Sequence, residues 1–135
     1  MRQFVQTRDE LYDTIITRAS IPKSRIVVAT AFSHTATYYR AQLIKRIEHG
    51  EIAMKGINQL ILKNGTRIYI NSASDTSLLG MRTDLVAIDE VMHLNIVNMA
   101  SFIGNCLKVS KDVIVTDEKI TERVETLRIF GFENI

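Results

Sequence analysis

Three short segments along the chain each contain an unbroken apolar run that is rich in β-branched residues. They fall at residues 25–32, 84–90 and 112–116. None alternates between apolar and polar positions, as a strand with one solvated face would. Unbroken apolar runs of this length are typical of strands buried on both faces of a parallel sheet. The sequence therefore predicts three central strands.

Other segments show the spacing of helices, with apolar residues three and four positions apart. Helices are predicted over 8–18, 37–48 and 95–107, and a final helix follows Thr116 or Asp117 and ends at Gly131. Thr7 and Glu10 form a capping-box pattern at the first of these. Residues 33–35 are expected to form a loop and cap ahead of the second helix.

A hairpin is predicted between residues 57–63 and 66–71, where Asn64-Gly65 separates two β-rich runs. Both turn residues are expected at positive φ, which Asn and Gly tolerate. Strands that alternate with helices indicate an α/β fold. We expect a single domain over 1–135, a three-layer sandwich whose sheet is mostly parallel and includes this β-hairpin.

Composition places the chain among ordinary globular proteins. It has 135 residues, of which 46% are hydrophobic and 24% charged, with one cysteine and a net charge of +2. These values exclude intrinsic disorder and a disulfide scaffold. No apolar run reaches the roughly 18 residues of a membrane span, so no membrane association is expected, and the first residues lack the apolar segment of a signal peptide.

The most distinctive feature is Asp89-Glu90, which follows four apolar residues. Ligands of open α/β sheets bind beyond the carboxyl ends of the strands. In nucleotide-hydrolysing α/β proteins a carboxylate at this position holds Mg²⁺, and its neighbour can polarise an attacking water. Taken alone, a strand that ends in two acidic residues is more often a solvated strand terminus.

The surrounding residues resemble the ATPase domain of large terminase subunits, the motors that package DNA into bacteriophage capsids. The resemblance rests on the Asn-Gly hairpin, the Ser-Ala-Ser-Asp loop at 72–75, Gly80 nine residues before Asp89, and a later strand that ends in Thr116, as a coupling motif does. It covers about residues 63–117, with a weaker match over 25–48. It implies a P-loop ATPase-like fold in which Asp89 and Glu90 correspond to the Walker B pair.

Departures from that family are as informative as the matches. No segment fits G-x-x-x-x-G-K-[ST], the loop whose backbone N–H groups and lysine cradle phosphates. Relatives often have arginine just before the glycine, where this chain has Leu79; Arg82 stands two residues beyond it. A strand-helix unit is expected to be missing, because the residues before 25 are predicted to form only one helix. No nuclease domain is expected after the coupling strand.

These departures imply a P-loop-less terminase paralogue with a degenerate ATPase fold that is not an enzyme and uses no cofactor. Triphosphate binding needs aligned N–H groups and a cation, and the missing loop supplied both. The carboxylates would then be vestigial, with Asp89 at most a weak Mg²⁺ ligand. We expect a phage protein of the host cytoplasm that binds the packaging motor, DNA or copies of itself, since a lost unit would leave an edge to cover.

Two other hypotheses about the function of the chain remain open. The chain could be a compact metal-dependent ATPase or nuclease that uses Asp89 and Glu90, with Asp75 or Asp84. It could instead be a host-directed interaction protein that uses the fold as a rigid platform.

Three basic residues suggest a nucleic-acid patch on the second helix. Arg40, Lys45 and Arg46 can neutralise phosphates, and Tyr38 and Tyr39 near the start of the helix can stack on bases. The simpler interpretation is a solvated helix face, because charged runs usually indicate one.

The histidines and the cysteine suggest no metal site, since their spacing fits no zinc pattern. They are His34, His49, His93 and Cys106. Of these, His34 is the best placed to face a cleft, and Cys106 is expected in the core.

Overall fold

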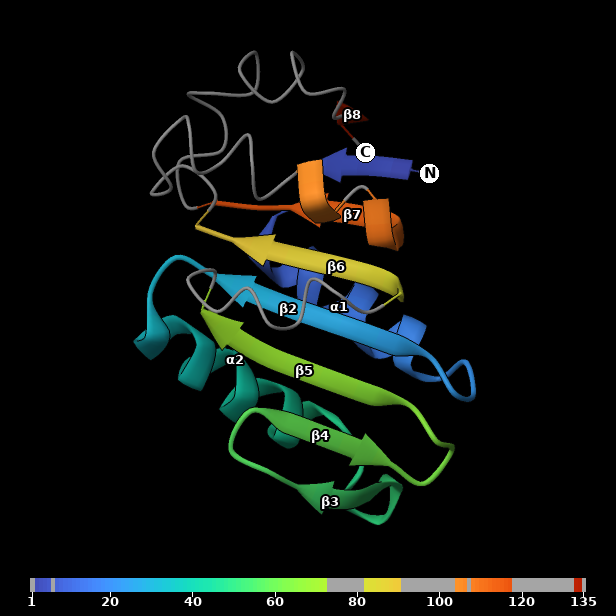
Figure 1. Cartoon of the computed structure of the whole chain (residues 1–135). Helices are drawn as coiled ribbons and strands as arrows, with labels where there is room; N and C mark the ends of the chain where they lie inside the picture. Colours follow the sequence, from blue (N-terminus) through green and yellow to red (C-terminus); the bar gives the residue numbers. More distant parts are fainter. Residues whose placement is uncertain are drawn as a thin grey trace.

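The computed structural model describes residues 2–5, 7–72, 82–90, 104–106, 108–117 and 133–134 (Figure 1). The helices are α1 (Arg8–Ala19) and α2 (Ser33–Arg46), with a short 3₁₀ turn, η1 (His49–Glu51). The strands are β1 (Arg2–Val5), β2 (Arg25–Thr30), β3 (Ile52–Lys55), β4 (Gln59–Leu62), β5 (Arg67–Ser72), β6 (Thr83–Asp89), β7 (Ser110–Val115) and β8 (Glu133–Asn134).

The strands that the structure describes form one sheet in the order β3-β4-β5-β2-β6-β7-β1-β8. From β5 to β8 in this order every neighbouring pair is parallel, whereas β4 runs antiparallel to both of its neighbours, β3 and β5. The prediction of an α/β fold with a mostly parallel sheet and a hairpin is therefore confirmed. All parallel strands end at one edge, on the left of Figure 1, and begin at the opposite edge.

The predicted hairpin joins β4 to β5, but its turn differs from the expected one. Leu62 and Thr66 close the turn: the Leu62 N–H donates to the Thr66 carbonyl at 2.9 Å, and the Gly65 N–H donates to the Leu62 carbonyl at 3.0 Å. Only Gly65, at φ 87°, takes the left-handed conformation expected of both turn residues. Asn64 acts through its side chain instead, because its Oδ1 accepts from the Thr66 N–H at 3.0 Å.

Helix α1 begins where its capping pattern predicts. Thr7 is the N-cap, and its hydroxyl oxygen accepts from the Glu10 N–H at 3.3 Å. Helix α2 starts earlier than predicted, since residues 33–35 are already helical. Its N-cap is Phe32, which makes no side-chain capping bond.

Helices α1 and α2 pack on the same face of the sheet (Figure 1). One cluster of buried residues joins Leu11 and Ile15 of α1, Leu43 of α2, and alternate residues of the strands such as Ile26. The other strand residues, among them Val27, Val86 and Val113, are buried as well. Both faces of the central strands are therefore covered, as the predicted three-layer arrangement requires.

The expectation that the residues before 25 form only one helix was wrong. Strand β1 precedes α1 and pairs in parallel with β7, so a strand-helix unit is present. Its four residues, Arg-Gln-Phe-Val, are too few and too polar to stand out as a buried strand.

Most of the predicted helices over 95–107 and after 117 lie outside the described residues, although residues 104–106 are helical. Among the described residues, no helix is both long and apolar enough to cross a membrane.

Candidate functional site

The predicted acidic pair lies at the carboxyl edge of the sheet, at the end of β6. Asp89 is the strand's last residue, and its register neighbour on β2 is Thr30. The Asp89 side chain is fully buried, with 0% of its surface exposed. A buried carboxylate must find charge and hydrogen-bond partners within the protein, because leaving water is costly.

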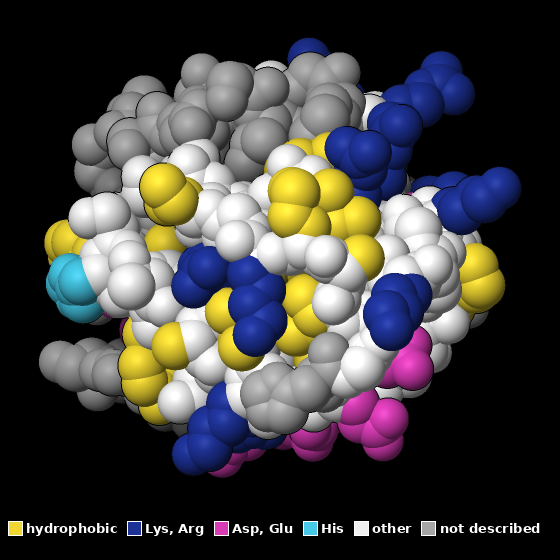
Figure 2. Space-filling view, turned by 90° about the horizontal axis from the view of Figure 1, so that it is seen from below, with side chains coloured by type: hydrophobic (Ala, Val, Ile, Leu, Met, Phe, Trp, Pro, Cys, Tyr) yellow, Lys and Arg dark blue, Asp and Glu magenta, His cyan; other side chains and the backbone are white. Residues whose placement is uncertain are grey.

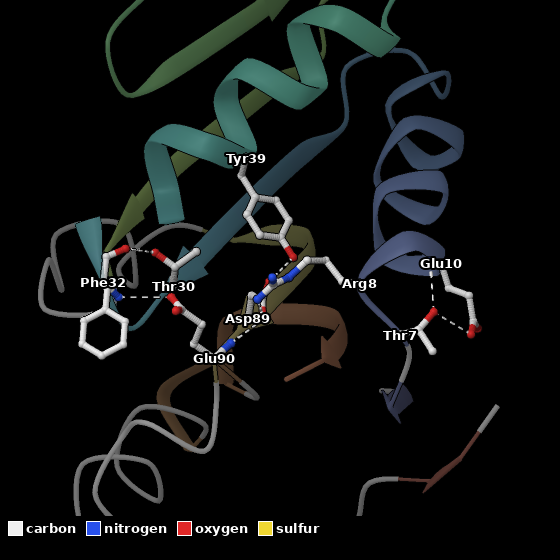
Figure 3. Close-up of polar contacts among 8 residues, drawn as sticks. All are labelled: Thr7, Arg8, Glu10, Thr30, Phe32, Tyr39, Asp89 and Glu90. Atoms are coloured by element: carbon white, nitrogen blue, oxygen red, sulfur yellow. Dashed lines mark hydrogen bonds and ion pairs between the residues drawn. The ribbon is translucent and has the colours of Figure 1, made fainter. Parts of the chain in front are cut away.

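Arg8, in the first turn of α1, provides the opposite charge (Figure 3). Its Nε lies 2.6 Å from Oδ2 of Asp89, and its Nη2 lies 3.2 Å from Oδ1. This is a two-point contact between a guanidinium and a carboxylate, the strongest geometry that such a pair adopts. The interaction therefore gives both oxygens of Asp89 a donor.

Two further donors complete the surroundings of Asp89. The hydroxyl of Tyr39, on α2, donates to Oδ2 at 2.5 Å, and the Glu90 N–H donates to Oδ1 at 2.6 Å. Figure 3 shows the Tyr39 and Arg8 side chains converging on Asp89 from the two helices. The carboxylate thus ties α1 and α2 to the end of β6.

An aromatic pair supports this network from within the core. The rings of Tyr12 and Tyr39 lie 4.8 Å apart, and the guanidinium of Arg46 lies 4.6 Å from the centre of the Tyr12 ring. Burial raises the pKa of Tyr12 to about 12. Burial, with the neighbouring charge of Asp89, raises the pKa of Tyr39 well above its usual value. Both hydroxyls therefore keep their protons at neutral pH, and Tyr39 remains a donor to Asp89.

Glu90 also has a partner within the chain. Its Oε1 accepts from the Phe32 N–H at 3.3 Å, at the start of α2 (Figure 3). A negative charge at a helix N-terminus is favourable, and α2 has no side-chain cap of its own. Glu90 itself sits at φ 59°, a conformation that is costly for a residue other than glycine. This backbone turn carries the Glu90 carboxylate toward α2.

The structure separates the other predicted carboxylates from this pair. Asp84 lies near the beginning of β6, at the opposite edge of the sheet, where its Oδ1 is 3.4 Å from the Lys111 ammonium. Asp75 lies outside the described residues. In the described part of the chain, no group of three or more His, Cys, Asp or Glu residues is arranged to hold a metal ion.

The predicted nucleic-acid residues of α2 have different surroundings. The Nε of Arg40 donates to the Gly56 carbonyl at 2.7 Å. Arg46 lies over Tyr12, and its Nη1 is 3.8 Å from a carboxylate oxygen of Asp13. Lys45 is exposed. Since two of the three side chains contact the protein itself, a patch composed of all three stays a prediction.

The histidines and the cysteine are not brought together in the described structure. His34 is exposed and stacks on Phe32, with ring centres 5.5 Å apart. The His49 side chain and all of His93 lie outside the described part. Cys106 is buried as predicted, and burial raises the pKa of its thiol to about 12, which makes it a poor nucleophile.

Sequence reasoning missed Arg8 and the hydroxyl of Tyr39. The suggestion that Tyr39 could stack on bases was wrong, because its side chain is fully buried and its hydroxyl donates to Asp89; Tyr38 is exposed. Arg8 is 81 residues from Asp89, and no local pattern connects the two. The one available signal is indirect: a buried carboxylate requires a cation, and Arg8 follows a helix cap.

Solved structures identify the fold. The large terminase of bacteriophage HK97 matches with a TM-score of 0.66 at 10% identity, over 91% of this chain and 33% of that one. The large terminase of a thermophilic bacteriophage matches with a TM-score of 0.69 at 10% identity, over 98% of this chain and 39% of that one. The chain therefore has a terminase-like α/β fold.

The chain spans only 33% and 39% of the lengths of these two terminases. No protein-family model matches it, and no curated protein matches it in sequence.

Proposed function

We propose that this chain is a non-enzymatic phage protein with a degenerate terminase ATPase fold, which acts by binding the DNA-packaging machinery, DNA or copies of itself. The observation that carries the proposal is the contact of Arg8 with both oxygens of Asp89, at 2.6 and 3.2 Å. The terminase-like fold supports a role connected with DNA packaging.

Arg8 lies where a nucleotide-binding protein of this class needs a metal ion. In P-loop proteins Mg²⁺ is held jointly by the Walker B aspartate and a Ser or Thr at the start of the helix that follows the loop. Here the aspartate position is Asp89, and the first turn of the helix carries Arg8. A divalent cation would have to displace a guanidinium from a buried carboxylate, and the two positive charges would repel each other.

The short connection between β1 and α1 also supports the proposal that the phosphate cradle is missing. A phosphate loop inserts a run of glycine-rich backbone between strand and helix, so that several N–H groups point at one anion. Only Gln6 and Thr7 separate β1 from α1, and the oxygen of Thr7 caps the helix. Two residues without glycine are too few to surround a phosphate group.

The acidic pair has a structural explanation in the same contacts. Asp89 joins α1 and α2 to β6, while Glu90 supplies the charge at the start of α2. Neither role involves hydrolysis. The pair therefore supports folding without requiring a substrate.

Calorimetric titration of the protein with Mg-ATP tests the proposal. We expect no saturable binding by the wild-type chain. Saturable binding that is weakened by Asp89→Asn would overturn the proposal and favour a metal-dependent enzyme. The matched control is Asp84→Asn, the same chemical change at the opposite edge of the sheet. Circular dichroism would confirm that both variants remain folded.

A further inference from the structure

The amino-terminal edge of the sheet, opposite Asp89, is lined by basic residues. We refer to it as the basic rim; its members are Lys23, Arg25, Lys63, Arg67, Arg82, Lys108 and Lys111, all exposed. They lie where β2, β5, β6 and β7 begin, or in the segments that directly precede these strands. Figure 2 shows several Lys and Arg side chains gathered toward the right-hand end of the molecule, the end at which β2 and β5 begin in Figure 1.

The centre of the rim is a row of residues across four neighbouring strands. Arg67 of β5 and Arg25 of β2 are register partners, and the pairing of β2, β6 and β7 continues the row through Asp84 to Lys111. With strands about 4.8 Å apart, the row is about 14 Å long. Arg25 and Arg67 thus place like charges on adjacent strands, which is unfavourable, and Asp84 on the other side of Arg25 offsets only part of this repulsion.

The row extends at both ends. Beyond β5, the Lys23 N–H donates to the Asn64 carbonyl at 3.1 Å, which brings Lys23 to the hairpin turn that carries Lys63. Beyond β6, Arg82, Lys108 and Lys111 line a surface hollow of about 430 Å³. Positive charge therefore continues along the edge instead of converging on one point.

Within the described residues, acidic groups compensate only part of this charge. Asp84 lies within the row, but its Oδ1 is 3.4 Å from the Lys111 ammonium and its Oδ2 accepts from the Arg25 N–H at 2.9 Å. Asp112, one residue further along β7, is paired with Arg18 at 2.6 Å. No carboxylate is paired with the guanidinium of Arg25 or Arg67 in the described structure.

We propose that the basic rim binds the sugar–phosphate backbone of a nucleic acid. This inference rests on the proposed function, in which the chain acts by binding, and it assigns the surface and the ligand. Successive phosphates of one strand advance about 3.4 Å along a duplex, so the central row spans about four of them. A linear polyanion matches an extended row, whereas a single phosphate would need one convergent cradle.

An acidic protein surface fits the rim less well than nucleic acid does. Protein interfaces usually need large apolar or aromatic anchors at their centre. Of the large hydrophobic residues that are exposed in the described structure, only Ile21 lies near the rim; the others are Phe32, Tyr38, Met54 and Ile57. Arginine, by contrast, is well suited to phosphate groups.

Fluorescence anisotropy with a 5′-labelled duplex of arbitrary sequence, titrated over a series of NaCl concentrations, tests the rim. Arg25→Gln with Arg67→Gln should lower affinity about tenfold and reduce the slope of log K against log[NaCl] by about 2, since each phosphate contact contributes about 0.9. The matched control is Lys55→Gln, which removes one charge from an exposed site outside the rim and outside the predicted patch on α2. Lys55→Gln should leave the slope nearly unchanged, whereas Arg25→Gln alone should reduce it by about 1.

Three results would overturn the proposal. One is the absence of salt-dependent binding by the wild-type chain to both the duplex and the single strand of the same sequence. Another is an equal loss of slope in Lys55→Gln and in Arg25→Gln, which would indicate net charge instead of the rim. The third is displacement of the duplex by poly-glutamate at lower charge concentration than by unlabelled duplex, which would indicate an acidic protein ligand.

The test is independent of the nucleotide titration. Failure to bind nucleic acid would overturn the assignment of the rim and leave the absence of nucleotide binding intact. Saturable binding of Mg-ATP would overturn the proposed function without changing the salt dependence at the rim.

Discussion

The charged side chains at the two edges of the sheet differ in burial and in their partners. At the carboxyl edge, Asp89 is fully buried and Arg8 and Tyr39 donate to it. At the amino edge, Arg25 and Arg67 stand side by side in water. Buried charges depend on their partners for stability, whereas exposed charges contribute little to stability and remain able to bind a ligand. The edge where α/β proteins usually bind ligands is here occupied by the chain's own side chains.

The largest expected effect is the loss of the buried pair. Arg8→Met should lower the free energy of unfolding by about 2–4 kcal/mol, because it leaves a buried carboxylate without its cation; the partial exposure of Arg8 places the effect below that of a fully buried pair. Urea unfolding followed by circular dichroism measures it.

A second substitution separates lost charge pairing from lost packing. Combining Arg8→Met with Asp89→Asn replaces the buried charge by a neutral amide, so part of the stability should return. If the double variant is as unstable as the sum of the two single variants, Arg8 and Asp89 are not coupled and the contrast between the two edges fails.

A smaller effect is expected at the tyrosine pair. Tyr39→Phe should cost about 1–2 kcal/mol of unfolding free energy, because it removes the hydroxyl that donates to Asp89. Tyr12→Phe is the matched control, since the Tyr12 hydroxyl is buried without a hydrogen-bond partner in the described structure and its removal should be close to neutral. Equal costs for the two variants in the same urea measurement would contradict the role given to Tyr39.

The smallest effect on stability is expected at the rim. Arg25→Gln with Arg67→Gln should change the free energy of unfolding by no more than about 0.5 kcal/mol, because both side chains are exposed. A small gain is as compatible with the structure as no change, since the two like charges are neighbours. A loss of about 2 kcal/mol or more, measured by urea unfolding, would show that these arginines support the fold.

Much of the sheet could be predicted from the sequence. The unbroken apolar runs that became β2, β6 and β7 are determined by burial on both faces, and this leaves a strong local pattern. The hairpin was predictable from Asn64-Gly65, although the turn type was not. Strands β1 and β3 escaped prediction because four residues of mixed polarity carry no usable period.

Of the residues in the candidate site, only the two acidic ones could be predicted from the sequence. Asp89 and Glu90 are visible as a pair that ends an apolar strand, but their partners come from other elements. Arg8 and Tyr39 reach Asp89 through the arrangement of α1 and α2, and this depends on strand order. The basic rim was hidden for the same reason: its residues are scattered singly along the chain and become a row only when the strands align.

The position of Glu90 has a consequence for how acidic signatures are interpreted. Its carboxylate, carried by a residue at φ 59°, accepts from the backbone at the first turn of α2. Replacing Glu90 would destabilise the start of α2 whether or not the protein hydrolyses a nucleotide. An Asp-Glu dipeptide after an apolar strand can thus have a structural role, and its presence alone does not identify a motor.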